Sequence, residues 1–598
     1  GRMLFSLSQY YAAQGALHHI HWFCLCLFCQ AGRYFSLNRA KVHPMCGWNV
    51  YMAEPLETPR VQSKSDRLTG QELIIYEDEH LLVVNKPAGL NTHAPSLFAG
   101  EGLYDWLRHR EPCWERLAIV HRLDKDTSGL IVFTKSPLAN RSLTEQFTRR
   151  GVRKEYVFLT DRFVPVRKVI AKSVLVRTGE KYTSRPLHAG GNVAETHFEV
   201  VHSTAGSTLV AAQPVTGRTH QIRAQAAAYG FPILGDTLYG GTPAGRVCLH
   251  AAELGFKHPE TGAELQFEVL PDFSEDAGLA LRHGIIDLPA TNAYRLIHGA
   301  ADGWPGWYVE RLGDFLLSQA EQPLSSEQRQ VLSQWMNQFS WRGVYHRIWT
   351  RQLQQTKTEE RFPNCVLGEM APPVFFVREN GLQFELSFAE GCSVGLFLDQ
   401  RENRRRILTN HVAAGFPLFQ KEREQTEVLN TFAYTCGFSV CAAKSGARVT
   451  SLDLSRKYLA WGKRNFAVNG LNAAGHDFIL GDAFDWLGRL AKKGRVYDLV
   501  ILDPPTFSRS KDWETFRAEK DYGRLVSAVL PLLANNGVLF ASTNAAQVSP
   551  AQFLEVISAA VTARKLRIHQ AHYVPQPLDF PVTRAEPAYL KTAWFRIG

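Results

Sequence analysis

One carboxylate stands in a short basic stretch whose residue types could support nucleophilic chemistry. Asp124 lies within His121–Gly129, between Arg122 and Lys125 and just before a Thr-Ser-Gly turn. A carboxylate can attack an electrophilic carbon when neighbouring cations keep it ionised. The alternative is a turn residue whose oxygens accept hydrogen bonds from backbone N–H groups. Taken alone, the Asp-x-x-Thr-Ser-Gly pattern favours the turn.

A second group of carboxylates follows successive strands in the C-terminal half. Strand-like segments at 427–430, 448–453, 478–480, 497–503 and 538–543 alternate with helical ones such as 456–468. This order predicts an α/β doubly wound, Rossmann-like, seven-stranded sheet. Asp453, Asp482 and Asp503 would then end neighbouring strands at the edge where such sheets bind cofactors. Each acid alone could be a helix cap or turn residue, but three in succession indicate a cofactor pocket.

The N-terminal half has a different pattern. Its strand-like segments have few long amphipathic helices between them, which predicts an α+β domain with a mixed, largely antiparallel sheet. We expect five regions: an N-terminal extension of unknown role at 1–65, the first domain at 72–272, a linker at 273–290, a small α+β substrate region at 291–385, and the doubly wound domain at 386–598.

Five blocks of the first domain occur in an order that resembles the RluA-type RNA pseudouridine synthases. They are Asn85–His93, His121–Gly129, Lys154–Tyr156, Thr216–Arg223 and Gly235–Gly240. The resemblance implies that Asp124 acts on C1′ of a uridine, that Arg223 is the active-site guanidinium, and that Tyr156 stacks on the base and shuttles a proton. No cofactor is implied for this domain. The alternative is a catalytically inactive RNA-binding module.

The same resemblance implies contacts with RNA. Arg122 would fill the space that a flipped-out uridine leaves, and Arg218 and His220 belong to the fourth block. The chain carries a formal charge of +10, which fits a polyanionic partner. We therefore expect RNA as the partner.

The start of the doubly wound domain resembles motif I of class I S-adenosylmethionine-dependent methyltransferases. The motif departs from its glycine-rich form, because Ala433 stands where glycine is common and only Gly437 remains. The resemblance implies S-adenosylmethionine as cofactor. The expected cofactor-binding residues are Asn430, Thr431, Phe432, Tyr434, Gly437, Asp453, Asp482 and Asp503.

Residues 291–598 are similar to the large-subunit ribosomal RNA methyltransferases of the cytosine-C5 and guanine-N7 kinds. Cytosine-C5 members use a cysteine after the fifth strand, because C5 is unreactive until a thiolate adds to C6. Here Ala541–Ala546 contains no cysteine, and we expect Cys436 and Cys441 to be packed side chains. Methylation at a nucleobase nitrogen therefore fits better, and the resemblance of Asn544 to an asparagine of the guanine-N7 members implies guanine N7. The acceptor-side residues would be Pro504, Pro505 and Asn544.

Composition sets the remaining limits. Hydrophobic residues make up 45% of the 598 and charged residues 21%, which is typical of globular domains. The apolar run Ile20–Cys29 is too short to span a membrane, so we expect a cytoplasmic protein without a membrane partner. Cys24, Cys26 and Cys29 could bind metal with a nearby histidine, but an apolar patch is the preferred interpretation, and we expect no metal site.

These patterns predict a bifunctional RNA-modifying enzyme. One site would isomerise uridine, and the other would methylate a base. We expect this base to be a guanine and the substrate to be ribosomal RNA. The alternatives are a synthase with a vestigial or cytosine-C5 methyltransferase domain, and a non-catalytic ribosome assembly factor. The target nucleotides and the oligomeric state stay open.

Overall fold

The computed structural model describes residues 73–349, 362–390, 393–420, 425–508 and 516–598. The chain divides into two compact units, of which Glu145–Pro271 belongs to one, and Thr69–Thr144 with Asp272–Gly598 forms the other. Each is described by itself below. The predicted extension at 1–65, including Cys24, Cys26 and Cys29, lies outside the described residues.

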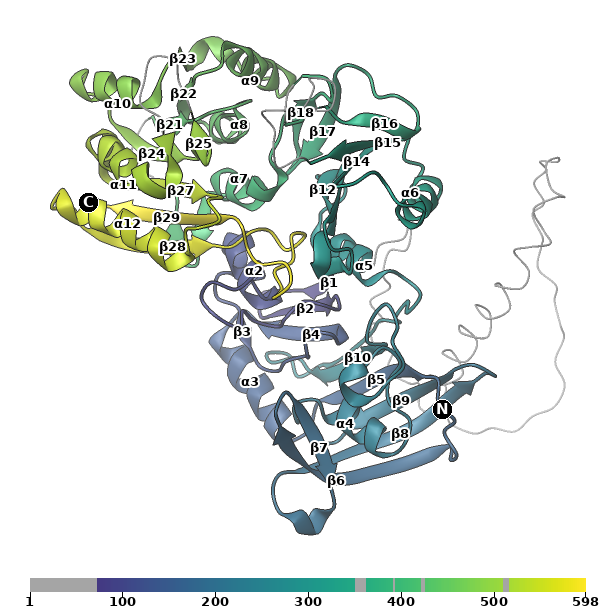
Figure 1. The fold of residues 1–598 in the computed structure, drawn as a ribbon. Coiled ribbons are helices and arrows are strands. Elements are labelled where there is room, and N and C mark those ends of the chain that lie inside the picture. The colour runs from purple at the N-terminus through teal and green to yellow at the C-terminus, as the bar shows by residue number, and fades with distance from the viewer. Residues whose placement is uncertain (1–72, 350–361, 391–392, 421–424, 509–515) are drawn as a thin grey trace, which may run out of the picture. The chain divides into compact units, whose positions relative to one another are not determined.

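An antiparallel sheet forms the first unit, as the sequence predicts. Its strand order is β10-β5-β9-β8-β6-β7, and β11 pairs with the other edge of β10 (Figure 1). One face is covered by helix α4, and Phe158, Phe198 and Phe231 pack together in the core beneath it. The bounds are β5 (Arg153–Thr160), β6 (Lys168–Thr178), β7 (Lys181–Arg185), β8 (Val193–Ser203), β9 (Thr208–Pro214), α4 (Gln221–Ala228), β10 (Leu249–Lys257) and β11 (Glu264–Glu268).

The second unit begins with a small antiparallel layer. Strand β2 pairs with β1 and β4, and β3 pairs with β4. Every residue of β2 and β4 is buried, which explains why both read as continuous apolar runs. The bounds are β1 (Ile74–Glu77), β2 (Leu81–Lys86), α2 (Leu103–Arg110), β3 (Ala118–Ile119), β4 (Ser128–Thr134) and α3 (Pro137–Thr148).

A helix and a five-stranded sheet follow in the same unit. Helix α5 (Ala277–Ile285) occupies the predicted linker, and its buried Arg282 donates two 2.7 Å hydrogen bonds to Asp302. The sheet runs β12-β13-β14-β15-β16, with α6 joining the parallel pair β14 and β15. The bounds are β12 (Ala293–His298), β13 (Trp307–Leu312), β14 (Phe315–Ala320), α6 (Ser326–Phe339), β15 (Gly343–Ile348), β16 (Asn364–Gly368), and the hairpin β17 (Phe375–Glu379) with β18 (Leu382–Leu386).

A seven-stranded sheet of order β23-β22-β21-β24-β27-β29-β28 completes the unit and confirms the predicted doubly wound fold (Figure 1). The first five strands are parallel, and β29 is antiparallel to both of its neighbours. The strands are β21 (Glu427–Thr431), β22 (Arg448–Asp453), β23 (Asp477–Leu480), β24 (Tyr497–Leu502), β27 (Leu533–Thr543), β28 (Ile568–Val574) and β29 (Lys591–Ile597).

Helices cover both faces of this sheet. They are α7 (Arg401–Leu408), α8 (Gly437–Lys444), α9 (Arg456–Val468), α10 (Ala483–Lys492), α11 (Ala518–Val529) and α12 (Pro550–Ala563). The remaining strands are short: β19 (His411–Ala413), β20 (Phe416–Pro417), β25 (Phe507–Ser508) and β26 (Phe516–Arg517). Helix α9 has the predicted bounds, because Ser455 caps its N-terminus and Gly470 follows its end at a φ of +70°.

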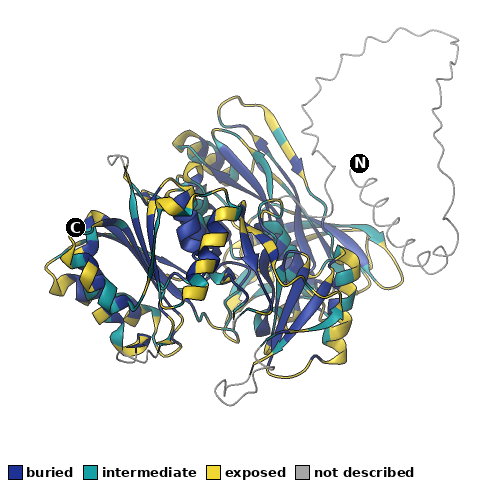
Figure 2. Ribbon diagram, turned by 90° about the horizontal axis from the view of Figure 1, so that it is seen from above, coloured by how far each residue is buried: buried dark blue, intermediate teal, exposed yellow. Residues whose placement is uncertain are grey.

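Alternate residues of each central strand enter two separate cores. Leu499 and Ile501 of β24 pack with α8 and α9, whereas Val500 and Leu502 pack with α10, α11 and α12. The period of two in a strand places consecutive side chains on opposite faces, so a strand covered by helices on both sides is apolar throughout. Figure 2 shows the strands buried and the outer helix faces exposed. Within the described residues, none of the helices combines the length and apolarity needed to cross a bilayer.

Candidate functional sites

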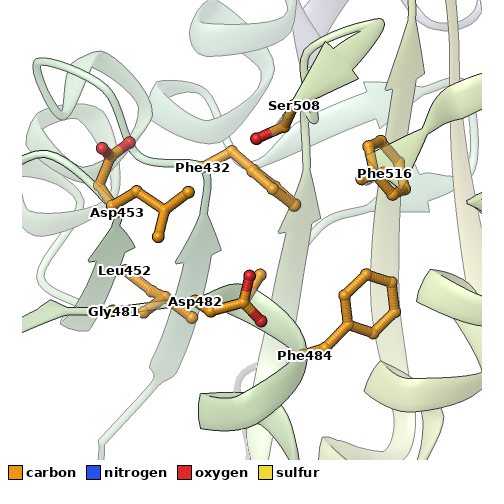
Figure 3. A pocket seen from close by; sticks show the side chains of 10 residues that line it. Phe432, Leu452, Asp453, Gly481, Asp482, Phe484, Ser508 and Phe516 are labelled. Atoms are coloured by element: carbon orange, nitrogen blue, oxygen red, sulfur yellow. The ribbon is translucent and has the colours of Figure 1, made fainter. Parts of the chain in front are cut away.

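A cleft opens at the carboxyl ends of β21, β22 and β23, where the strand order predicts a cofactor site. Three phenyl rings, two carboxylates and the peptide at Gly481 lie around it (Figure 3). The cleft is partly open to solvent. Its lining residues are Phe432, Leu452, Asp453, Leu454, Gly481, Asp482, Ala483, Phe484, Ser508 and Phe516.

Asp453 is fixed in this cleft by the backbone. Its Oδ2 accepts from the Tyr434 N–H at 2.8 Å, and its Oδ1 accepts from the Ser455 N–H at 2.8 Å. Burial raises the pKa of Asp453, although both hydrogen bonds work in the opposite direction. Each carboxylate oxygen has a further lone pair that can accept from a hydroxyl group. Asp453 is therefore suited to bind the hydroxyl groups of a ribose, as the sequence predicts.

Asp482 has two roles in the structure. Its Oδ1 accepts from the Asp485 N–H at 3.2 Å and caps helix α10, while the residue also lines the cleft. The sequence alone left the cap and the pocket as alternatives, and the structure shows both. Gly481 precedes it with a φ of +159°, and a Cβ there would lie 2.1 Å from Trp486 Nε1. A side chain at Gly481 would therefore displace this wall of the cleft.

The loop after β21 adopts left-handed conformations without glycine. Phe432, Tyr434 and Cys436 have φ values of +57°, +49° and +63°. Non-glycine residues reach this region at a cost of about 1–2 kcal/mol each, so packing must hold them there. Tyr434 is held by Asp453 and by a 3.2 Å hydrogen bond from its hydroxyl to the Ser393 carbonyl. Tertiary contacts thus replace the glycines that the sequence lacks at motif I.

Four predicted cofactor residues of this motif do not line the cleft: Asn430, Thr431, Tyr434 and Gly437. Asn430 is buried and donates to Ser439 Oγ at 2.8 Å, and Thr431 is buried and donates to the Ile501 carbonyl at 2.7 Å. Gly437 begins helix α8, where a Cβ would lie 3.3 Å from Leu396. The side chains of Asn430 and Thr431 thus join β21 to helix α8 and to strand β24.

Asp503 lies deeper, at the end of β24, beside Gln400 and Ser542. Gln400 Nε2 donates to Ser542 Oγ at 2.8 Å and to Asp503 Oδ1 at 3.3 Å. Burial raises the pKa of Asp503 to about 6. Asp503 does not line the open cleft but lies beside the turn of the proposed methyl acceptor.

The predicted acceptor-side residues lie on two turns that are hydrogen-bonded to each other. Pro504 is buried and Pro505 exposed, and the next residue, Thr506, donates from its hydroxyl to Asn544 Oδ1 at 2.7 Å. Asn544 is exposed. The turn after β24 and the turn after β27 are therefore joined where the sequence predicts that a base binds.

Neither cysteine near the cofactor loop is suited to nucleophilic catalysis. Cys436 and Cys441 are fully buried, and burial raises the pKa of Cys436 to about 12 and that of Cys441 further. Cys436 Sγ packs against Gly462, where an added Cβ would lie only 2.3 Å from the sulfur. Both thiols are packing groups, which agrees with the prediction.

Sequence reasoning did not single out Phe484, Phe516 or Gln400 as site residues. The rings of Phe432 and Phe484 each lie 6.2 Å from Phe516, measured between ring centroids. Phe484 lies two residues after Asp482, which the sequence had already indicated as a cofactor residue. Its position after β23 could therefore have identified it. Phe516 and Gln400 come from segments distant in sequence, and only the fold brings them to this edge.

In the other catalytic region, the first two blocks are hydrogen-bonded to each other. The buried Lys86 ammonium donates to the carbonyls of Pro87, Leu90 and Lys125 at 2.7–3.0 Å. Thr92 Oγ1 donates to the Leu123 carbonyl at 2.8 Å and accepts from its N–H at 3.1 Å. A buried ammonium is stable when carbonyls satisfy its donors, so Lys86 fixes the loop that carries Asp124.

Asp124 lies at a tight turn just before β4. Its carbonyl accepts from the Thr127 N–H at 3.2 Å, and Gly129 follows with a φ of +114°, a conformation that favours glycine. Arg122 is exposed, as an RNA-contacting residue must be. The turn predicted from this pattern is therefore present, and it holds Asp124 between a buried strand and the Lys86 loop.

Arg223 and Tyr156 lie in the antiparallel unit. Arg223, on α4, is buried and makes a two-pronged ion pair with Asp236, at 2.6 and 2.9 Å. Tyr156 is half-buried on β5. His220 caps α4 with a φ of +54° and bonds the Tyr239 hydroxyl at 2.8 Å, and Arg218 is exposed. The fourth and fifth blocks thus meet through Arg223 and Asp236.

Asp124 belongs to the other compact unit. Its closeness to Tyr156 and Arg223 stays a prediction from the sequence.

The residues of the open cleft fit S-adenosylmethionine. Carboxylates at the ends of β22 and β23 can accept hydrogen bonds from an adenosine, and the rings of Phe432, Phe484 and Phe516 provide an apolar surface for its base. The fold and this donor set define the class: a doubly wound domain that binds a nucleoside cofactor, in a chain that also has an antiparallel module.

Two family profiles match the chain, one in each half. The profile for RNA pseudouridylate synthase matches residues 80–228, and that for S-adenosylmethionine-dependent methyltransferase matches residues 294–596. The chain belongs to the S-adenosylmethionine-dependent methyltransferases and carries an RNA pseudouridylate synthase domain before that region. The two family memberships predicted from the sequence motifs are confirmed.

Similar proteins fall into the same two groups. A ribosomal RNA large subunit methyltransferase of Deinococcus radiodurans is 33% identical over 54% of this chain and 78% of its own length. The ribosomal large subunit pseudouridine synthase C of Escherichia coli is 38% identical over 34% of this chain and 67% of its own. Among solved structures, a methyltransferase complexed with SAH covers 57% of this chain and 87% of its own, at 26% identity and a TM-score of 0.46.

Proposed function

We propose that this enzyme modifies ribosomal RNA at two sites, isomerising a uridine to pseudouridine and methylating a guanine at N7. The relatives named above act on the large ribosomal subunit, which supports ribosomal RNA as the substrate and the cytoplasm as the place of action. The absence of a usable thiol supports nitrogen rather than cytosine-C5 methylation: within the described residues, the cysteines near the cofactor loop are buried and protonated. The burial of these thiols is the observation on which the choice of a nitrogen over cytosine C5 rests.

In the isomerisation, Asp124 takes up the charge that develops at C1′ when the bond from C1′ to N1 of uracil breaks. The uracil turns, and C5 joins C1′ while the proton on C5 is lost and N1 is protonated. Tyr156 stacks on the base. The ion pair with Asp236 holds the Arg223 guanidinium in position. Lys86 contributes by keeping the Asp124 loop in one conformation.

In methyl transfer, S-adenosylmethionine supplies an electrophilic methyl group. Asp453 and Asp482 would hold the cofactor, and the Pro504–Thr506 turn would hold the acceptor base. Asn544 Oδ1 already accepts from Thr506, which leaves its Nδ2 group to donate to an acceptor such as O6 of guanine. Alignment of donor and acceptor can supply on the order of 7–11 kcal/mol, so N7 needs no general base.

Nucleoside mass spectrometry tests both activities. Unmodified ribosomal RNA is incubated with the full chain and S-adenosylmethionine, and RNA from a strain lacking the gene is compared with that of its parent. We expect pseudouridine and 7-methylguanosine to form. Asp124→Asn should abolish only the first product and Asp453→Ala only the second, so each variant is the control for the other. The appearance of 5-methylcytidine would replace the N7 assignment, and the formation of neither product would favour an assembly factor.

A further inference from the structure

Within one compact unit, the segment around helix α2 packs against the doubly wound domain. His411 Nε2 bonds the Arg108 carbonyl at 2.9 Å, and Arg110 pairs with Glu402 at 3.5 Å. Phe98 packs edge-on against Tyr573, with 5.1 Å between ring centroids. This interface joins parts of the chain that are about 300 to 475 positions apart.

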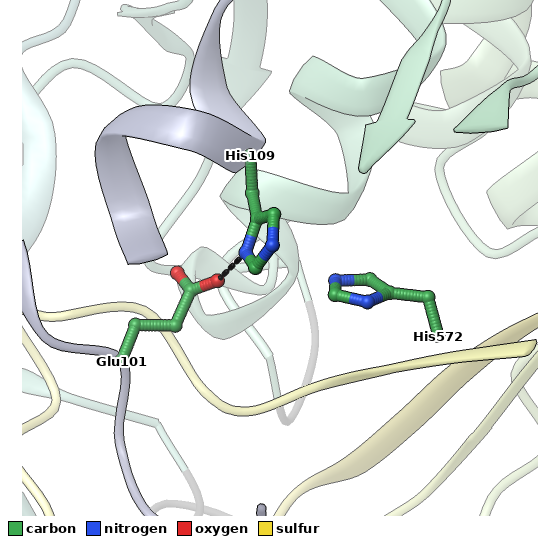
Figure 4. A group of neighbouring side chains, drawn as sticks. All are labelled: Glu101, His109 and His572. Atoms are coloured by element: carbon green, nitrogen blue, oxygen red, sulfur yellow. Dashed lines mark hydrogen bonds and ion pairs between the residues drawn. The ribbon is translucent and has the colours of Figure 1, made fainter. Parts of the chain in front are cut away.

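Three side chains with metal-binding atoms converge there: Glu101, His109 and His572. One ligand atom from each lies within 4.8 Å of the other two. His109 Nδ1 and Glu101 Oε1 are 2.6 Å apart, and the rings of His109 and His572 are 4.5 Å apart at an angle of 69°. Glu101 lies just before α2, His109 lies in its last turn, and His572 comes from β28 (Figure 4).

His572 has an unsatisfied donor or acceptor at this point. Its Nε2 is buried and makes no hydrogen bond with any described residue. A buried polar atom without a partner is costly, so a native fold usually supplies one. In Figure 4 the His572 ring faces His109, so the unpaired nitrogen belongs to the same cluster.

The cluster combines one carboxylate with two imidazoles, and the buried Arg406 guanidinium lies 3.7 Å from Glu101 Oε1. Burial would raise the pKa of Glu101, but the hydrogen bond with His109 and the nearby Arg406 lower it overall. Burial, together with the charges of His109 and Arg406, lowers the pKa of His572 well below its ordinary value. The Arg406 guanidinium also donates to the carbonyls of Val412 and Glu402, at 3.0 and 3.1 Å. Ionised carboxylate and neutral imidazole are the forms that bind zinc.

We propose that Glu101, His109 and His572 bind a zinc ion that joins the α2 segment to strand β28. Two nitrogens and one oxygen are a common zinc ligand set, with water in the fourth tetrahedral position. Bonds of about 2.0–2.1 Å place tetrahedral ligand atoms roughly 3.3 Å apart, so Glu101 and His109 would separate slightly and His572 would move closer to them. The metal would satisfy His572 Nε2 and stabilise the interface.

Zinc titration of the full chain, stripped with a chelator, tests this proposal by calorimetry. We expect one zinc per chain and a rise in melting temperature of a few degrees on loading. His572→Ala and His109→Ala should each weaken zinc binding by roughly a hundredfold or more and abolish the rise. His569→Ala is the matched control, because His569 lies on the same strand but is exposed. Unchanged zinc affinity in both variants, or no stoichiometric zinc in the parent chain, would overturn the proposal.

A second measurement exchanges the His572 side chain for another metal ligand instead of deleting it. In His572→Cys loaded with Co²⁺, a thiolate ligand should add a near-ultraviolet sulfur-to-cobalt absorption that the parent chain lacks. His569→Cys should show none. If the two cysteine variants gave the same cobalt spectrum, His572 would not be a ligand.

Discussion

Asp453 and Tyr434 are joined by a hydrogen bond from the Tyr434 N–H to Asp453 Oδ2 at 2.8 Å, which links the end of β22 to the loop after β21. Tyr434 has a φ of +49°, so the bond also holds a residue in a conformation that it would rarely adopt alone. The carboxylate therefore both lines the cleft and shapes it.

Replacing Asp453 by alanine should weaken S-adenosylmethionine binding by roughly 10–100-fold. Hydrogen bonds to a charged group contribute about 1.5–3 kcal/mol, and each 1.4 kcal/mol is a factor of ten. Calorimetry with the full chain measures the affinity. Asp485→Ala is the control, because Asp485 pairs with Arg489 on the surface of α10 and does not line the cleft. Equal affinities in the two variants would show that Asp453 does not bind the cofactor.

Asp503→Asn should stabilise the protein at neutral pH but not in acid. The folded-state pKa of Asp503 is raised from 3.8 to about 6, so the folded state binds a proton more tightly than the unfolded state. The penalty for ionising Asp503 is absent below about pH 4, grows as the pH rises to about 6, and is then constant at on the order of 3 kcal/mol.

Urea unfolding at pH 4, 5, 6 and 7.5 measures this difference for parent and variant. We expect the variant's advantage to grow with pH and to level off above pH 6. Asp485→Asn, which breaks a partly exposed ion pair with Arg489, is the control variant. A constant difference across the series would mean that Asp503 titrates normally.

The ion pair between Glu379 and Arg404 should contribute strongly to stability. Both side chains are buried, and two hydrogen bonds of 2.6 and 2.8 Å join them. Glu379→Gln leaves a buried guanidinium without its counter-ion, which typically costs about 3–5 kcal/mol. Glu369→Gln breaks the exposed pair with Arg342 and should cost about 0–1 kcal/mol. Melting temperatures compare them, and a similar small loss in both would contradict the argument.

Methylation should not depend on a cysteine near the cofactor. Cys436→Ala and Cys441→Ala should keep methyl transfer within a few-fold of the parent, apart from any loss of stability, because both thiols are buried and protonated. Among the cysteines of the described residues, iodoacetamide should label the exposed Cys113 first and leave methyl transfer intact. A covalent complex between the enzyme and an RNA containing 5-fluorocytidine would instead indicate cytosine-C5 chemistry.

Much of the methyltransferase fold was predictable because its signals are local. Strand-like runs of three to seven residues predict β21, β22, β23 and β24, and the helical pattern before Gly470 predicts α9, all at nearly their observed bounds. Strands β28 and β29 were not predicted, since β28 is polar on one face and β29 pairs antiparallel at the far side of the sheet. Helix α5 was taken for a linker, because the contacts of its Arg282 involve residues up to 297 positions away in the sequence.

The sequence by itself determined the types of chemistry: one carboxylate within a recognisable set of blocks, and acids at the ends of strands that alternate with helices. Both features can be recognised from the sequence, because they depend on the spacing of residues along the chain and on hydrophobic periodicity. Tertiary structure alone decided that Asn430 and Thr431 support the core, that Phe516 lines the cleft, and that His572 meets His109. Such contacts join distant segments, so they depend on how whole elements pack rather than on any pattern within one of them.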